Sequence, residues 1–169
     1  LVTGPGPVVG DEIAADPGTH AVGFIGSIAT GRRVAERAAG KELLLEMGGN
    51  GPLVVLEDAD LDRAVDATLV ACFLNAGQSC TAGERILVQR AVHDEFLRRL
   101  TDAVASRVRL GDPLDDATTI GPLNNPGVAA KTEEHVGDAV AWGARVLAGG
   151  THAPRHGSDL FFEPTIVAG

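Results

Sequence analysis

The chain has 169 residues and is 44% hydrophobic, which is enough for one globular domain or for parts of two. It carries 23 acidic and 14 basic side chains and no basic run, so nucleic acid is disfavoured as a partner. Its apolar stretches are far shorter than the roughly 20 residues that a bilayer-spanning helix needs, so we expect no membrane segment.

The cysteines and histidines fit no metal site. Cys72 and Cys80 form neither a disulfide framework nor a zinc-ligand pair, and the five histidines are scattered. We therefore predict that no metal is bound and that the protein works in a reducing, cytoplasmic setting.

The first third of the chain is typical of alternating strands and helices. Residues 21–25 are predicted to form a buried strand, and Gly26 and Ser27 then open a helix that runs to about residue 39. A short apolar strand over residues 43–45 leads directly into Glu46. A double glycine follows, and we place a domain boundary there because no core pattern crosses it.

The remaining residues continue the same alternation, which predicts an α/β fold with mostly parallel strands. Asp58 or Asp60 is placed to cap a helix, and Asn125 with Pro126 starts another. We expect that last helix to turn Val140 inward. The strands are expected at residues 53–56, 85–89, 145–148 and 161–167; two further helices carry the apolar faces Leu61, Val65, Leu69, Cys72 and Phe96, Leu100, Val104, Val108.

Three segments could carry chemistry, although each also has a purely structural interpretation. Small residues around Cys80 leave its thiol open to a reactant, but a structural loop thiol would look the same. Glu46 ends an apolar strand, where partial desolvation would make it a better general base, but it could equally point into water. Gly26 and Ser27 could hold a phosphate at a helix N-terminus or only cap that helix. Cys72 is expected to be a small core residue.

Taken in order, these segments resemble the aldehyde dehydrogenase superfamily. The resemblance is carried by Phe24-Ile25-Gly26-Ser27, by Leu45-Glu46-Met47-Gly48-Gly49-Asn50-Gly51-Pro52 and by Gly77-Gln78-Ser79-Cys80. Cys80 follows Glu46 by 34 positions, which is the spacing that the family uses between nucleophile and base. Ile25, Met47 and Asn50 depart from the usual threonine, leucine and lysine, but none of these changes removes a group that the reaction requires.

The resemblance implies an enzyme that oxidises a small-molecule aldehyde to a carboxylate with NAD or NADP. Cys80 would attack the aldehyde and pass through a thiohemiacetal and a thioester, and Glu46 would activate the water that hydrolyses the thioester. Cofactor contacts would come from Gly26, Ser27, Gly48 and Gln78.

The resemblance also implies a partial enzyme, because the family's upstream asparagine and lysine and its downstream Glu-Ile-Phe-Gly-Pro segment are absent. Residues 1–48 would be the end of a Rossmann-type NAD(P)-binding domain and residues 49–169 most of an α/β catalytic domain. The parent enzyme would be a homodimer or homotetramer, and the chain alone would be inactive. The alternative is a noncatalytic fragment or pseudoenzyme. A cysteine hydrolase is disfavoured because the nearest histidine, His93, belongs to another predicted element.

Overall fold

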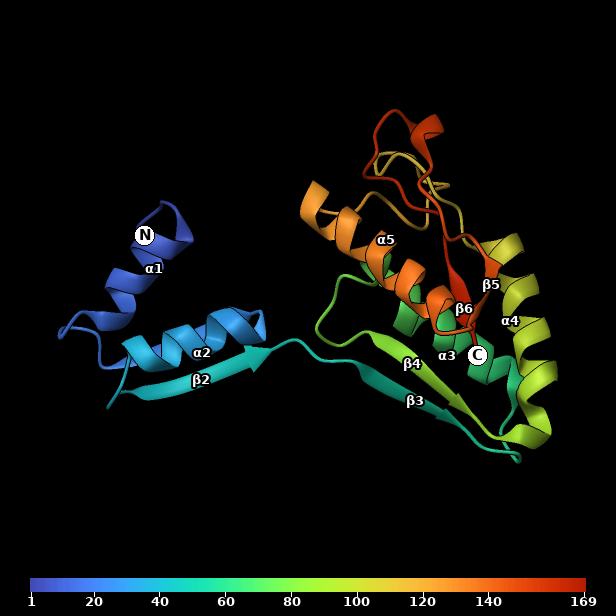
Figure 1. The fold of residues 1–169 in the computed structure, drawn as a ribbon, viewed down its shortest axis with the longest axis horizontal. Coiled ribbons are helices and arrows are strands. Elements are labelled where there is room, and N and C mark those ends of the chain that lie inside the picture. Colours follow the sequence, from blue (N-terminus) through green and yellow to red (C-terminus); the bar gives the residue numbers. More distant parts are fainter. The chain divides into compact units, whose positions relative to one another are not determined.

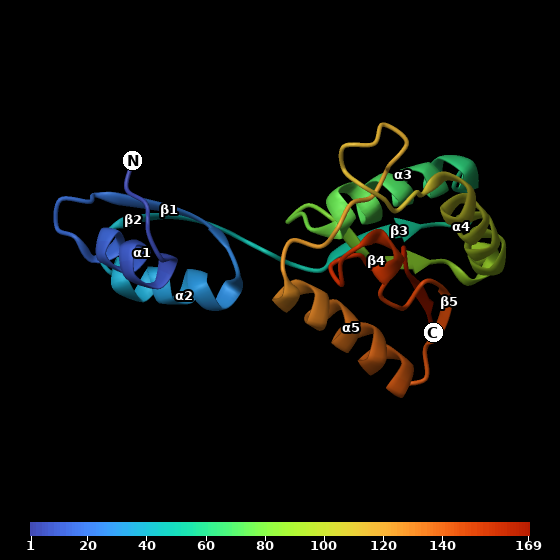
Figure 2. The ribbon, with the colours of Figure 1, turned by 90° about the horizontal axis from the view of Figure 1, so that it is seen from above.

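The computed structural model describes all 169 residues as two compact units, Leu1–Gly49 and Asn50–Gly169. Figures 1 and 2 label the elements of each unit. The chain forms three separate two-stranded sheets, of which two are parallel and one is antiparallel. No helix combines the length and hydropathy needed to cross a membrane.

The unit Leu1–Gly49 consists of one parallel strand pair and two helices. In chain order these are α1 (Gly6–Ala15), β1 (Ala21–Gly26), α2 (Ile28–Arg37) and β2 (Glu42–Met47). The helices are linked because Arg33 Nε and Arg37 Nε each lie 2.8 Å from a carboxylate oxygen of Asp11. At the C-terminal end of α1, Lys41 Nζ donates to the carbonyls of Ala14 and Asp16 at 2.7 and 2.6 Å.

The sequence reasoning missed α1. Pro5 stands at its N-cap and Pro7 in its first turn, where a proline's fixed φ suits a helix start. The surrounding glycines weaken the helical pattern, so the segment looked like an irregular apolar run.

The strand at residues 21–25 was predicted to be buried, and this was wrong. Registered partners of a parallel pair share a face, and here Gly23 pairs with Leu44 and Ile25 with Glu46. That face is open within its unit, because Ile25 is 76% and Leu44 65% exposed. Figure 2 shows α1 and α2 together on one side of the strand pair. Helices that pack on a single face leave the opposite apolar side chains uncovered.

The unit Asn50–Gly169 has a core built on two long helices. Figure 1 labels its main helices and strands. The elements are β3 (Gly51–Val55), α3 (Leu61–Phe73), η1 (Leu74–Gly77), β4 (Gly83–Val88), η2 (Arg90–Val92), α4 (His93–Arg107), α5 (Pro126–Ala141), β5 (Arg145–Ala148), η3 (Pro154–His156) and β6 (Ile166–Ala168). The predicted apolar faces of α3 and α4 supply most of the main core cluster, which comprises Val55, Val65, Leu69, Phe96, Leu100, Val104 and Ile166.

Helix caps follow the sequence closely in this unit. Asp60 begins α3, and its Oδ1 accepts hydrogen bonds from the N–H groups of Asp62 and Arg63 at 3.1 and 3.2 Å. Asn125 caps α5 by accepting from Val128 N–H at 3.0 Å. Side-chain oxygens at these positions satisfy N–H groups that have no partner inside the helix.

Two expectations for the C-terminal region were wrong. Val140, predicted to face inward, is 47% exposed near the C-terminal end of α5. The strand predicted over residues 161–167 is reduced to β6, and Phe162 forms only an isolated bridge with His152. Pro164 interrupts the segment because proline has no N–H to donate to a neighbouring strand.

Candidate active site

Cys80 lies in the loop that joins η1 to β4, and the backbone that leads to it is unusual. Asn75, Ala76 and Gly77 adopt left-handed conformations in succession, with φ values of 53°, 56° and 71°. For a residue with a Cβ, this region costs roughly 1–2 kcal/mol. The sequence predicted a turn of small residues here but gave no sign of three consecutive left-handed residues, two of which are not glycine.

Hydrogen bonds around Gln78 hold this loop. Its Nε2 donates to the Asn75 carbonyl at 3.0 Å, and its backbone N–H donates to the same carbonyl at 3.1 Å. In return, the side-chain Nδ2 of Asn75 donates to the Gln78 backbone carbonyl at 3.2 Å. Gln78 Oε1 accepts from the backbone N–H of Asn124 at 2.8 Å. The Gln78 amide therefore already binds two backbone groups.

Cys80 itself is exposed, and its backbone N–H differs from those of its neighbours. Ser79 N–H donates to Gly77 O at 2.9 Å, Thr81 N–H to Ser79 Oγ at 3.3 Å and Ala82 N–H to Ser79 O at 3.1 Å. Within Asn50–Gly169 the Cys80 N–H donates to no acceptor. An accessible thiol and a free N–H donor thus belong to the same residue.

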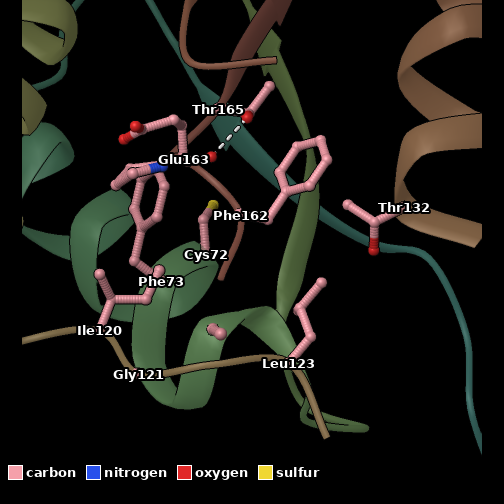
Figure 3. A pocket seen from close by; sticks show the side chains of 11 residues that line it. Cys72, Phe73, Ile120, Gly121, Leu123, Thr132, Phe162, Glu163 and Thr165 are labelled. Atoms are coloured by element: carbon pink, nitrogen blue, oxygen red, sulfur yellow. Dashed lines mark hydrogen bonds between the residues drawn. The ribbon is translucent and has the colours of Figure 1, made fainter. Parts of the chain in front are cut away.

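The second thiol, Cys72, has the opposite environment. It is partly buried and lines a pocket of about 160 Å³ with Phe162 and Glu163 (Figure 3). Its thiol donates to the Gly83 carbonyl. Burial, with a smaller effect from the Glu84 carboxylate, raises the pKa of Cys72 to about 11. This thiol is therefore protonated near neutral pH and cannot act as a nucleophile there.

Glu46 lies near the end of β2, and of its two sequence interpretations the structure of this unit matches the exposed one. It pairs with Ile25 on the open face of the β1–β2 sheet and is exposed within its unit. The predicted partial desolvation is therefore absent here, because no element of Leu1–Gly49 covers that face. Gly48 follows it closely and donates its N–H to the Gly26 carbonyl at 3.3 Å.

Ser27 caps α2, as one of the two sequence interpretations proposed. Its Oγ accepts from Thr30 N–H at 3.2 Å and lies 2.9 Å from Thr30 Oγ1. The N–H groups of Ile28 and Ala29 have no partner within the helix, so the N-terminus of α2 still offers donors to an anion. At the adjoining Gly26, a Cβ would collide with the Phe24 ring, so this position requires a residue without a side chain.

A cavity between α1, α2 and β1 adjoins this helix start. It holds about 430 Å³ and is lined chiefly by apolar groups, including Pro7, Ile13, Phe24 and Val34, with Thr30 and Arg33 among its polar ones. Sequence reasoning missed the cavity because it missed α1. The two prolines at the start of that helix were the available signal.

The predicted site residues thus fall into two groups. Gly26, Ser27, Glu46 and Gly48 come together at one end of the β1–β2 pair in Leu1–Gly49, and Gln78 and Cys80 share one loop in Asn50–Gly169. Nowhere do three or more histidine, cysteine, aspartate or glutamate side chains gather in a way that could hold a metal ion.

The model of the aldehyde dehydrogenase family matches residues 1–169, the full length of the chain. The chain belongs to the aldehyde dehydrogenase family. Its resemblance to that superfamily, inferred from three ordered motifs, is therefore confirmed, as is the expected aldehyde dehydrogenase-like α/β fold.

Individual aldehyde dehydrogenases match over nearly all of this chain. It is 44% identical over 169 residues to the NADP+-dependent succinate-semialdehyde dehydrogenase GabD of Escherichia coli (strain K12), covering 99% of this chain and 34% of that protein. It is 42% identical over 172 residues to a betaine aldehyde dehydrogenase of Bacillus subtilis (strain 168), covering 99% of this chain and 35% of that protein.

A solved aldehyde dehydrogenase has the same fold over the matched region. The structure of betaine aldehyde dehydrogenase from Staphylococcus aureus in complex with NAD+ superposes with a TM-score of 0.94 at 36% identity. The match covers 99% of this chain and 34% of that one. The chain thus spans about a third of the length of the relatives that it matches.

Proposed function

We propose that this chain is the part of an NAD(P)-dependent aldehyde dehydrogenase that carries the nucleophile and the general base. The observation that carries the proposal is Cys80, which combines an exposed thiol with a backbone N–H that has no acceptor in its own unit. The names of the relatives add support, because they include enzymes for succinate semialdehyde and betaine aldehyde. The substrate class is accordingly a small-molecule aldehyde.

In the proposed reaction the Cys80 thiolate attacks the aldehyde carbon. The new C–S bond turns the carbonyl oxygen into an oxyanion, and the Cys80 N–H donates a hydrogen bond to it. A bound nicotinamide supplies the hydride acceptor for the oxidation. The carbon is then held as a thioester on Cys80. Glu46 takes a proton from a water molecule, the water oxygen attacks the thioester, and cleavage of the C–S bond releases the carboxylate and restores the thiolate.

The residues of Leu1–Gly49 fit a dinucleotide. The α2 N-terminus offers free N–H groups beside Gly26 and Ser27, which suits the pyrophosphate, and the adjoining cavity suits the flat adenine ring. NAD and NADP are both represented, since GabD is named for NADP+ and the Staphylococcus aureus structure contains NAD+. Gly48 and Gln78 are proposed to lie near the nicotinamide.

The division of the chain into two units supports the proposed domains. Residues 1–48 would belong to the NAD(P)-binding domain and residues 49–169 to the catalytic domain, and the division between units falls next to this boundary, after Gly49. We propose that the parent enzyme is a homodimer or homotetramer and that Glu46 and Cys80 serve one reaction in it.

A chimera tests the proposal, because the chain aligns with one contiguous third of GabD. Replacing that segment of GabD with this chain should preserve NADPH formation from succinate semialdehyde. Cys80→Ser should lower the rate by at least about 10³, as loss of a covalent nucleophile does. Glu46→Gln should give a single burst of NADPH without turnover, because the thioester accumulates.

The chimera also separates the alternative. A folded chimera that gives neither burst nor turnover would favour a noncatalytic segment, and an active Cys80→Ser variant would contradict the mechanism. The 169-residue chain alone should give no turnover with either cofactor.

A further inference from the structure

We propose that Gln78 is a positioning residue that fixes the Cys80 backbone N–H where the oxyanion forms. This inference rests on the proposed function, since it concerns the same nucleophile. It assigns Gln78 a task that differs from contact with the cofactor, and it follows from how the side chain is bound within its loop.

The loop before Cys80 has a backbone conformation that needs support. Asn75, Ala76 and Gly77 are all left-handed, and Ser79 N–H then turns back to the Gly77 carbonyl at 2.9 Å. Asparagine tolerates this backbone region, but alanine does so poorly. A loop with this backbone relaxes toward other conformations unless surrounding contacts hold it, and Cys80 lies only three residues beyond Gly77.

Gln78 supplies those contacts from both ends of its amide. Nε2 binds the Asn75 carbonyl at 3.0 Å, at the start of the left-handed run. Oε1 binds the N–H of Asn124 at 2.8 Å, a residue 46 positions further along the chain. The side chain therefore joins the nucleophile loop to a segment of the unit that is remote in sequence.

The remote anchor is itself fixed. Asn124 lies between the buried Leu123, whose N–H donates to Leu160 O at 2.8 Å, and Asn125, which caps α5. The hydrogen bond between Gln78 and Asn124 therefore fixes the loop relative to this well-ordered segment. The N–H groups of Ser79, Thr81 and Ala82 are consumed within the loop, so the Cys80 N–H is the donor left for a ligand.

Two reactions of Cys80 separate positioning from plain accessibility. With p-nitrophenyl acetate, the thiolate adds to the carbonyl, an oxyanion forms, and p-nitrophenolate leaves to give an S-acetyl thioester. With iodoacetamide, the thiolate displaces iodide at a saturated carbon, and no oxyanion forms. The ratio of the two rate constants at Cys80, measured by peptide mass spectrometry, therefore reports the N–H donor.

The test uses the 169-residue chain with two matched substitutions. Gln78→Met keeps the length of the side chain but removes both hydrogen bonds. Gln89→Met is the control, because Gln89 Oε1 makes the same kind of brace, accepting from Glu57 N–H at 2.8 Å, at the far end of β4. Amide hydrogen exchange at Asn124 checks that the Gln78 brace exists and is broken.

We expect the acylation-to-alkylation ratio to fall about tenfold in Gln78→Met, with the alkylation rate unchanged. Gln89→Met should leave the ratio within twofold of the unmodified chain, and Asn124 N–H should exchange faster only in Gln78→Met.

Three results would overturn the inference. An unchanged ratio in Gln78→Met, with the unmodified chain still well above the urea-denatured chain, would remove the role of Gln78 and leave the proposed function standing. A ratio in the unmodified chain equal to that of the denatured chain would instead remove the oxyanion role of Cys80 N–H, and the inference with it. Unaltered exchange at Asn124 would show that the brace is absent in solution.

Discussion

Cys72 and Cys80 lie eight positions apart, yet their surroundings differ in burial. Cys72 is partly buried beside the pocket of Figure 3, donates to a backbone carbonyl and has a pKa raised to about 11 by burial and, to a smaller extent, by Glu84. Cys80 is exposed at the tip of a braced loop. Under the proposed function, this difference in burial assigns the nucleophile role to Cys80 and not to Cys72.

Alkylation with iodoacetamide at pH 8 should label Cys80 and leave Cys72 intact. A thiol with a pKa near 11 is only roughly 0.1% ionised at that pH, and partial burial slows its reaction further. Because the neutral form is favoured in the folded chain, protection should hold below pH 9 and weaken as the pH rises toward 11. Peptide mapping after a timed reaction measures both sites. Equal labelling of the two cysteines in the folded chain would contradict the assignment.

The sequence predicted the openness of the Cys80 loop but not the contacts that hold it. The small residues around Cys80 predicted an open turn, which the exposed thiol bears out. The bond from Gln78 to Asn124 joins residues 46 positions apart, and no local pattern encodes such a contact. The sequence left the exposure of Glu46 open for a similar reason, because an apolar run indicates that a strand exists but not which of its faces is covered.

The caps of α3 and α5 were predictable, because an acidic or amide side chain immediately before an apolar helical pattern satisfies N–H groups that the helix leaves free. The sequence left Asp58 and Asp60 as alternatives for α3, and the structure selects Asp60. Elements without such a signal were misjudged, as α1 and the segment before β6 show.

Asp60→Ala should lower the free energy of unfolding by about 1 kcal/mol, because its Oδ1 accepts from two N–H groups in the first turn of α3. Asp58→Ala is the matched control, since Asp58 is exposed and caps nothing, and it should change stability by less than about 0.5 kcal/mol. Urea titration followed by circular dichroism measures both. A larger loss in Asp58→Ala would show that the cap has been assigned to the wrong residue.

The ion pairs of α4 should make the chain sensitive to acid. Hydrogen bonds from Arg98 and then Arg99 lower the pKa of Glu95 from 4.5 to about 2, and Arg99 also reaches Asp62 on α3 at 2.6 Å. A carboxylate with a lowered folded-state pKa stabilises the fold above its unfolded pKa of about 4.5. That contribution disappears as the pH falls from there toward 2.

Glu95→Gln should therefore lower stability slightly at pH 7, because exposed ion pairs contribute weakly, and should reduce the loss of stability between pH 5 and pH 2.5 by a similarly small amount. Urea midpoints across this pH range measure the effect. Glu134→Gln is the control, since Glu134 is exposed and makes no ion pair or side-chain hydrogen bond, and its acid profile should match that of the unmodified chain.

At the scale of the whole molecule, the α/β class followed from the alternation of strands and helices, and two of the three strand pairs are indeed parallel. The burial predicted for residues 21–25 was wrong, because one face of that strand is exposed within its unit. A hydrophobic strand is consistent with coverage on both faces, but the unit Leu1–Gly49 supplies helices for one face only. Periodicity describes the element, whereas burial depends on what the rest of the fold brings to it.

The two units differ in how many large hydrophobic side chains they bury, and this difference predicts how each behaves when they are separated. In Leu1–Gly49 the only buried hydrophobic side chains are Ala14 and Ala38, whereas the main core cluster lies wholly within Asn50–Gly169. A segment of about 50 residues without large buried side chains cannot offset the entropy of ordering its backbone. Residues 50–169 expressed alone should therefore unfold cooperatively in urea, and residues 1–49 alone should not.

Circular dichroism and amide proton dispersion of the two separate pieces measure this directly. A cooperative transition in residues 1–49 would mean that the ion pairs of Asp11 and the two hydrogen bonds from Lys41 stabilise that unit far more than exposed polar contacts ordinarily do. Residues 1–49 could also be unfolded alone and show protected amides once the dinucleotide is added. Ligand binding would then supply the stability that the separate piece lacks, because a ligand that binds only the folded state shifts the equilibrium toward it.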